Sequence, residues 1–82
     1  MSESTKDITK VYIDSEPMTL SQFLKFTGNI SFGGLSKEFL KNNLIYVNDD
    51  KEERRGRKLY FNDKIKINKI TYLLLNTKER DN

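Results

Sequence analysis

The sequence predicts an α+β fold made of one strand, two short helices and then a strand-rich second half. Three observations support this prediction. Capping and turn residues delimit two segments with helical spacing of apolar residues, later segments alternate apolar and charged residues, and 82 residues suffice for one domain with a modest core. We expect this domain over residues 9–75, between flexible tails at residues 1–8 and 76–82, because both ends are polar and lack apolar periodicity.

The first strand is expected in the stretch TKVYID, where Val11 and Ile13 alternate with polar neighbours. The clearest local signal follows in MTLSQFLKFTG. Thr19 is suited to be a helix N-cap, and Gln22, three residues later, completes a capping box. Gly28 can end the helix in a left-handed conformation. These residues predict a helix whose apolar face is formed by Leu20, Phe23 and Leu24.

The stretch SFGGLSKEFLKNN predicts a second short helix that begins near Gly34 and has Asn43 as a left-handed stop. LIYVN follows as a strand and leads into a polar turn. DKIKIN and ITYLLLN are two further strands, joined by a hairpin loop at Asn68 and Lys69. The sequence leaves open whether the leucines at 73–75 are core or an exposed edge used for dimerisation, and we expect a monomer.

Composition excludes several kinds of function. Without cysteine or histidine, the usual nucleophile–base pairs and most transition-metal sites cannot form, so we expect no enzyme, no cofactor and no metal. The adjacent pairs Asp49–Asp50 and Glu52–Glu53 should point to opposite faces of a strand, and we interpret them as solvated turn and surface residues. The absence of cysteine and of any signal peptide or membrane-length apolar run predicts a cytoplasmic protein without membrane association.

Positive charge is concentrated in one internal segment, KEERRGRK, which we call the basic loop (residues 51–58). Its five positive and two negative residues give 5 − 2 = +3, equal to the net charge of the whole chain. A solvated or floppy basic arm is the ordinary interpretation of such a run. The guanidinium forks of Arg54, Arg55 and Arg57 nevertheless suit phosphate groups, and Gly56 allows a tight turn that could aim them together.

Residues on the two expected helices could extend this basic surface. The lysines concerned are Lys25, Lys37 and Lys41. Gly33 and Gly34 would let a phosphate approach unpaired N–H groups of the second helix, although a simple turn between two packed helices is the favoured interpretation. Tyr46 and Tyr60 could stack on bases, although half-buried packing is the commoner role for tyrosine on a strand.

Three stretches, taken in order, resemble the S-four (S4) RNA-binding domain, also called the alpha-L motif: TLSQFLKFTG, KEFLKNNLIYVN and RRGRKLYFNDKIKI. Within that family the sequence is most similar to small stand-alone bacterial YaaA-like proteins. The resemblance implies two short helices packed on a small, mostly antiparallel sheet, with the helices and the following strand-turn region forming an RNA-binding face. By position, it implies RNA contacts from Lys37, Lys41, Asn48, Arg54, Arg55, Arg57 and Lys58.

The sequence departs from the family pattern at three places. The Ser-Arg pair often found at the start of the second helix is Phe32-Gly33 here, so a family phosphate contact is missing. The turn glycine is replaced by Asp49, which puts a negative charge beside the expected RNA face. The Gly-Asp pair before the last strand of the resemblance is Asn62-Asp63, and asparagine tolerates a left-handed turn.

We therefore expect a non-catalytic protein that recognises structured, ribosomal RNA through phosphate contacts, during ribosome assembly or on ribosomal particles. The expected contact residues are Lys25, Gly33, Gly34, Lys37, Lys41, Asn48, Arg54, Arg55, Arg57 and Lys58. The alternative is an adaptor whose basic loop docks on an acidic partner protein. A third, less favoured hypothesis is an accessory domain that works in trans with an RNA-modifying enzyme.

Overall fold

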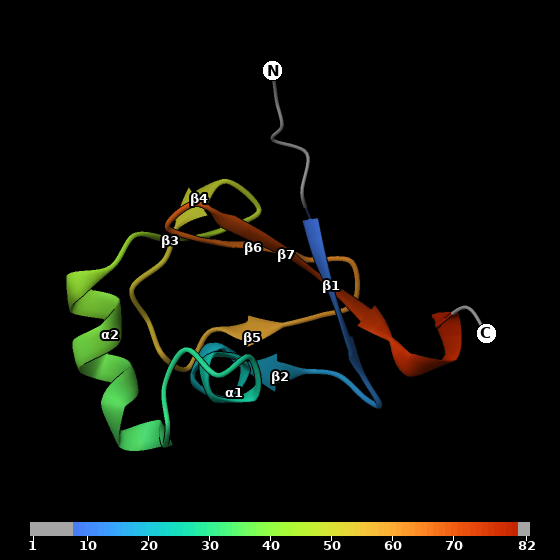
Figure 1. Ribbon diagram of the computed structural model, residues 1–82, viewed down its shortest axis with the longest axis horizontal. Helices are drawn as coiled ribbons and strands as arrows, with labels where there is room; N and C mark the ends of the chain where they lie inside the picture. Colours follow the sequence, from blue (N-terminus) through green and yellow to red (C-terminus); the bar gives the residue numbers. More distant parts are fainter. Residues whose placement is uncertain (1–7, 81–82) are drawn as a thin grey trace.

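The computed structural model describes residues 8–80 (Figure 1). Of the expected tails, residues 1–7 and 81–82 lie outside the described residues. The strands are β1 (Ile8–Ile13), β2 (Met18–Thr19), β3 (Ile45–Val47), β4 (Asp50–Lys51), β5 (Lys58–Leu59), β6 (Lys64–Ile67) and β7 (Ile70–Asn76). The helices are α1 (Leu20–Phe26) and α2 (Ser36–Asn42), with 3-10 turns η2 (Gly33–Leu35) and η3 (Thr77–Glu79).

Five strands form one mixed sheet in the order β1-β7-β6-β3-β4. β1 and β7 lie side by side and run parallel, with Val11 paired to Leu74, whereas every other neighbouring pair in this sheet is antiparallel (Figure 1). β2 and β5 form a second, two-stranded sheet beside α1. The prediction of an α+β fold with a mostly antiparallel sheet is confirmed.

β7 is an internal strand of the sheet, between β1 and β6. Leu74 is fully buried and Leu75 nearly so. The apolar run at 73–75 therefore belongs to the interior of the sheet and is not an edge to which a second molecule could add a strand. The expected hairpin between β6 and β7 is present, with Asn68 in the left-handed region at a φ of 56°.

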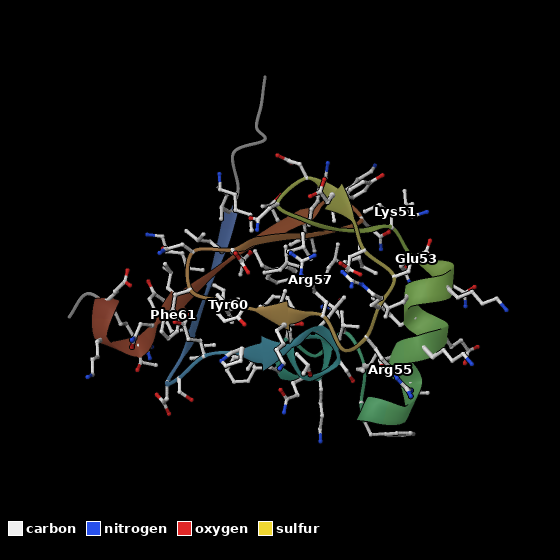
Figure 2. The ribbon with its side chains drawn as sticks, turned by 180° about the vertical axis from the view of Figure 1, so that it is seen from behind. Lys51, Glu53, Arg55, Arg57, Tyr60 and Phe61 are labelled. Atoms are coloured by element: carbon white, nitrogen blue, oxygen red, sulfur yellow. The ribbon has the colours of Figure 1, made fainter. Side chains whose placement is uncertain are left out.

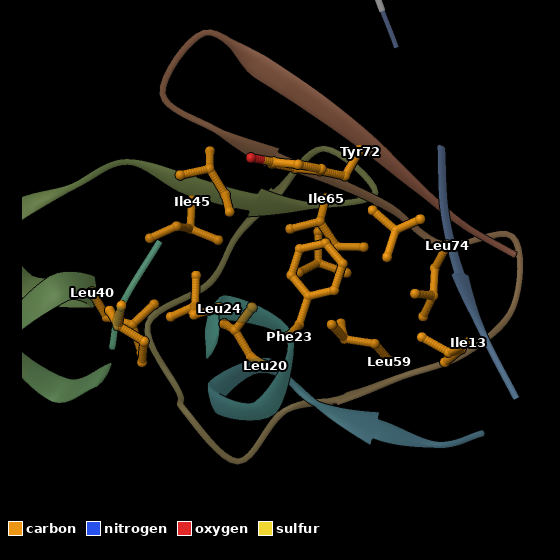
Figure 3. Packing of buried hydrophobic residues seen from close by; sticks show 14 residues of the cluster. Ile13, Leu20, Phe23, Leu24, Leu40, Ile45, Leu59, Ile65, Tyr72 and Leu74 are labelled. Carbon is orange, nitrogen blue, oxygen red and sulfur yellow. The ribbon is translucent and has the colours of Figure 1, made fainter. Parts of the chain in front are cut away.

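The core lies between the sheet and α1 (Figure 3). The apolar face predicted for α1 is completely buried, since Leu20, Phe23 and Leu24 are all 0% exposed. The rings of Phe23 and Tyr72, the latter on β7, pack in a T-shaped arrangement with centroids 5.4 Å apart and an interplanar angle of 85°. Fully burying side chains of this size stabilises a fold by ~1.5–3 kcal/mol each, so α1 is the main element that anchors the sheet.

The start of α1 has the predicted capping box. Gln22 N donates to Thr19 Oγ1 at 3.2 Å, and Thr19 N donates to Gln22 Oε1 at 2.9 Å. Gly28, two residues past the helix, has a φ of 81°, as predicted for a left-handed stop. The corresponding prediction for Asn43 is wrong. Asn43 has an extended backbone with a φ of −134°, because the chain enters β3 two residues later, and its side chain bonds Phe39 O instead.

α2 begins later than expected, because the two glycines form the 3-10 turn η2 and the α-helix starts at Ser36. Ser36 is fully buried. Its hydroxyl donates to Gly33 O at 2.7 Å and accepts from Ser21 Oγ at 3.1 Å, so this buried hydroxyl is paired both as a donor and as an acceptor. This short network holds the start of α2 against the start of α1. Among residues 8–80, no helix is long and apolar enough to cross a membrane.

Candidate nucleic-acid interface

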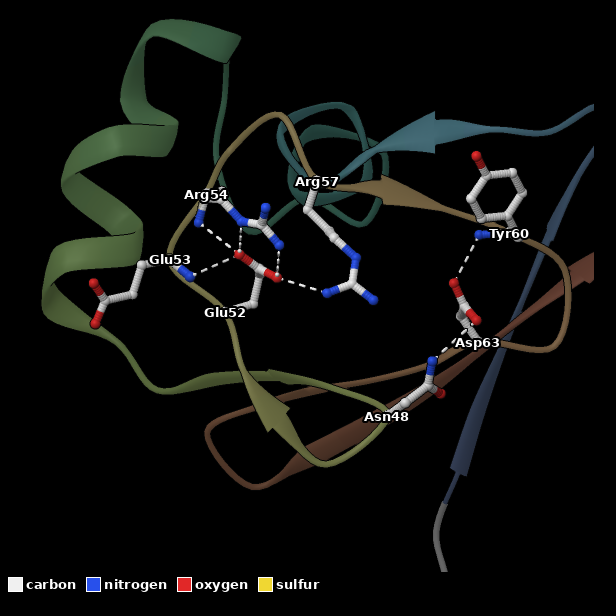
Figure 4. Close-up of polar contacts among 7 residues, drawn as sticks. All are labelled: Asn48, Glu52, Glu53, Arg54, Arg57, Tyr60 and Asp63. Carbon is white, nitrogen blue, oxygen red and sulfur yellow. Dashed lines mark hydrogen bonds and ion pairs between the residues drawn. The ribbon is translucent and has the colours of Figure 1, made fainter.

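The basic loop connects β4 to β5 and is organised around a buried carboxylate, that of Glu52 (Figure 4). Glu52 is only 5% exposed. Its Oε1 accepts from Arg57 Nη1 at 2.6 Å and from Arg54 Nη2 at 3.2 Å. Its Oε2 accepts from Arg54 Nε at 2.8 Å and from the backbone N–H groups of Arg54 and Glu53 at 3.0 and 3.2 Å. The prediction that Glu52 is a solvated surface residue is therefore wrong.

These five hydrogen bonds explain how a charge can be buried in so small a protein. A buried carboxylate without partners would be strongly destabilising, and here two guanidinium groups and two backbone N–H groups compensate for the lost water. The pKa of the Glu52 carboxyl is lowered from 4.5 to about 2. The largest cause is the side-chain hydrogen bond from Arg54, to which Arg57 adds, and together they outweigh burial, which by itself raises the pKa. Glu52 is therefore ionised at neutral pH.

The same loop is fixed to α1 through its backbone. Leu20 N donates to Arg57 O at 2.8 Å, and Ser21 N donates to Arg55 O at 2.9 Å. The first N–H groups of a helix have no partner within the helix, so the loop carbonyls complete the start of α1. Since Ser21 also bonds Ser36, the backbone of Arg55 is joined through Ser21 to the start of α2.

The three arginines of the loop have different environments. Arg57 is the most covered, with 28% of its side chain exposed, and it points inward to Glu52. The Arg54 side chain also bonds Glu52 but is 75% exposed. Arg55 is exposed, makes no ion pair within residues 8–80, and lies beside the first turn of α2 (Figure 2). Of the three, Arg55 is thus the one whose whole guanidinium is available to a ligand.

Two lysines of α2 face the loop. Lys37 and Lys41 are exposed, four residues apart, and with Leu40 and Glu53 they line a groove of about 360 Å³. A neighbouring hollow of about 450 Å³ continues along the same helix face and is lined by Gly34, Lys37, Glu38, Lys41 and Asn42. The structure therefore brings Lys37, Lys41 and the loop together. We call this surface the α2 groove.

Other expected contact residues are placed differently. Lys58 is exposed on β5, and Lys25 is exposed on α1 but lines neither hollow. Asn48 is used internally, since its Nδ2 donates to Asp63 Oδ1 at 3.0 Å and its Oδ1 accepts from Lys64 N at 2.9 Å. These bonds fix the β3–β4 turn against β6.

The two glycines of η2 lie at the edge of this surface, in the turn between the helices. A Cβ atom would lie 3.7 Å from Ser21 Oγ at Gly33 and 3.6 Å from the Phe32 ring at Gly34, which are ordinary contacts. Neither position therefore requires glycine for reasons of space. Among the possible stacking residues, Tyr46 is half-buried on β3 and Tyr60 is exposed.

Sequence reasoning missed Glu52 and Ser36 as organisers of this surface. The role of Glu52 is indicated in the sequence only by its spacing, because it lies two residues before Arg54 and five before Arg57. A turn at Gly56 can bring both of these arginines to one carboxylate. For Ser36 the signal was only a small polar residue following Gly-Gly, and its burial depends on Ser21, which is 15 residues away.

Comparison with known proteins identifies the family. A profile described as the S4 domain matches residues 11–74. The chain belongs to the S4 domain family. The two helices with a mixed, mostly antiparallel sheet agree with the alpha-L fold of this RNA-binding family, so the predicted family and fold are confirmed.

A curated relative of this S4 domain is the probable ribosome maturation protein RlbA of Bacillus subtilis (strain 168). The two sequences are 47% identical over 57 residues, which cover 70% of this chain and 80% of RlbA. No solved structure matches the chain significantly.

Proposed function

We propose that this S4 domain protein binds structured ribosomal RNA through phosphate contacts and contributes to ribosome maturation without catalysing a reaction. The observation that carries the proposal is the α2 groove, where Lys37 and Lys41 face a loop that displays Arg55. The ribosomal part of the proposal rests on the name of the relative RlbA.

The ion pairs of the loop decide which cations contribute most. Arg54 and Arg57 share Glu52, and Lys51 pairs with Glu53 at 3.4 Å. Lys37, Lys41, Arg55 and Lys58 make no ion pair within the described part of the chain. We assign the main phosphate contacts to these four residues, because a cation without a protein partner gives up the fewest interactions when it binds phosphate.

The remaining expected contact residues have secondary roles in this proposal. Arg54 contributes through the exposed side of its guanidinium, and Lys25 lies at the rim. Arg57 and Asn48 act by shaping the surface, since their polar atoms are engaged by Glu52, Asp63 and the backbone of β6. Gly33 and Gly34 let the RNA backbone come close to the first turn of α2.

A salt titration tests this assignment. The affinity of the purified protein for a structured ribosomal RNA fragment should fall linearly in log–log form with salt, at ~0.7–0.9 per phosphate contact. Arg55→Ala should reduce that slope by about one contact, and the double variant Lys37→Ala/Lys41→Ala by about two. Lys78→Ala is the matched control, because it removes the same charge from η3, on the opposite side of the molecule from α2 (Figure 1).

Two results would contradict the proposal. If Lys78→Ala reduces the slope as much as Arg55→Ala, the RNA responds to net charge and not to the α2 groove. If the wild-type protein does not bind the RNA but retains a nuclease-resistant protein partner through its basic loop, the adaptor hypothesis is supported instead.

A further inference from the structure

We propose that Glu52, an acidic residue, promotes RNA binding as the positioning residue of the basic loop. This inference rests on the proposed function and adds to it a residue that touches no RNA. Glu52 holds Arg54 and Arg57 against the protein, and in doing so it fixes the loop segment from which Arg55 projects beside α2.

The first step of the argument is that Glu52 makes the contacts that close the loop. It accepts hydrogen bonds from both ends of the turn, from Arg54 on one side and Arg57 on the other. Across that turn, Arg57 N donates to Arg54 O at 3.2 Å. The carboxylate thus occupies the centre of a closed turn with Arg55 and Gly56 at its tip.

The second step is that closure of the turn sets its attachment to the rest of the protein. In this closed turn, the carbonyl groups of Arg55 and Arg57 accept from the first two N–H groups of α1. Ser21, the donor to Arg55, is also bonded to Ser36. Through this chain of contacts the position of Arg55 relative to the α2 groove depends on Glu52.

The third step concerns charge. Without Glu52 the loop would hold three arginines and two lysines with only Glu53 to offset them, and their mutual repulsion would favour an open, mobile segment. A mobile segment must be ordered when RNA binds, which lowers affinity, whereas a preorganised one avoids that cost. Removing this negative charge should therefore weaken binding to a negatively charged ligand.

This expectation is opposite to that of simple electrostatics. Glu52→Gln raises the net charge from +3 to +4, which by charge alone should tighten RNA binding. Glu53→Gln makes the same chemical change at the next residue, where the carboxylate is 70% exposed and, among residues 8–80, pairs only with Lys51. The two variants have the same charge and composition, but only Glu52→Gln removes the central acceptor of the turn, whereas Glu53→Gln removes a carboxylate that lines the α2 groove and should if anything favour RNA.

The experiment measures the affinity of wild type, Glu52→Gln, Glu53→Gln and Glu52→Asp for one structured ribosomal RNA fragment, with affinities corrected for the folded fraction of each protein. We expect Glu52→Gln to bind about tenfold more weakly than wild type, and Glu53→Gln to bind as tightly or more tightly. Glu52→Asp keeps the charge on a shorter side chain and should restore part of the loss. Equal affinities for Glu52→Gln and Glu53→Gln would overturn the proposal.

A second measurement needs no RNA. Amide hydrogen exchange should show loss of protection at Leu20 and Ser21 in Glu52→Gln, because these amides donate to the loop carbonyls, while Leu74 in the core stays protected. Unchanged protection at Leu20 and Ser21 would also overturn the positioning role. If Glu52→Gln unfolds, Glu52→Asp decides the question. A Glu52→Asp protein with wild-type RNA affinity and wild-type protection at Leu20 and Ser21 would refute the positioning role.

The RNA-binding and hydrogen-exchange measurements together distinguish failure of this inference from failure of the proposed function. If wild type itself shows no salt-dependent binding to the RNA, the proposed function fails. The exchange measurement would then still report whether Glu52 fixes the basic loop.

Discussion

Lowering the pH should destabilise this protein through Glu52 in particular. The carboxyl has a pKa of about 2 in the folded protein against an ordinary 4.5. A difference of about 2.5 in pKa corresponds to about 3.5 kcal/mol at ~1.4 kcal/mol per unit. Because the main partner, Arg54, has an exposed side chain, solvent screening reduces this value, and we expect a contribution of about 2 kcal/mol.

The sign of the effect follows from the lowered pKa. The unfolded chain takes up the proton first as the pH falls, so Glu52 stabilises the folded state fully above about pH 5 and progressively less toward about pH 2. Urea unfolding of wild type and Glu52→Gln across this range isolates the effect. The difference in their unfolding free energies should shrink by about 2 kcal/mol between about pH 6 and 2.5, while contributions from other carboxylates cancel.

Glu53→Gln again provides the control, since the Glu53 side chain is 70% exposed and its one ion pair within the described residues is with an exposed lysine. Its difference from wild type should remain within ~0.5 kcal/mol over the same range. A difference between wild type and Glu52→Gln that stays constant with pH would refute the reasoning, because it would mean that the carboxylate gains nothing from its arginine partners on folding.

Three further predictions concern stability and are measured by urea unfolding at neutral pH. Phe23→Ala should cost ~3–5 kcal/mol, because the ring is fully buried against Tyr72, and a cost below ~1.5 kcal/mol would contradict the core described above. Thr19→Ala should cost ~1 kcal/mol through loss of the capping box, and no change would mean that the loop carbonyls alone suffice to cap α1. Asp49→Gly should stabilise the protein by ~0.5–1 kcal/mol, because Asp49 has a φ of 74°, and destabilisation would show that the aspartate side chain is needed in this turn.

Local features of the fold could be predicted from the sequence. The capping box at Thr19 and Gln22 and the alternation of Ile65 and Ile67 with lysines each depend on a few neighbouring residues, and both predictions are confirmed. The stop at Asn43 was predicted wrongly because the following strand, and not the asparagine, determines the backbone there. The pairing of β1 with β7 could not be predicted, since nothing in either segment specifies a partner so distant in the chain.

The candidate site was predictable only in part. Residue type alone identifies the cationic residues of the site. Which of them form ion pairs with protein carboxylates depends on the closed shape of the basic loop, which the sequence does not show. For Glu52 the sequence predicts a surface position, because adjacent charges on a strand normally reach solvent. The structure shows that the chain turns away from the strand at this point, so that two arginines can surround the carboxylate.

The position of β7 has a consequence for how the protein is made. β7, the last of the described strands along the chain, is internal to the sheet and provides the only partner that β1 has among the described strands. A nascent chain that has not yet exposed β7 therefore lacks an internal strand of the sheet and the aromatic partner of Phe23. Premature termination before Ile70 would leave an unfolded product whose arginines are not held in place. Synthesis of β7 and acquisition of the ordered loop are thus linked by strand order alone.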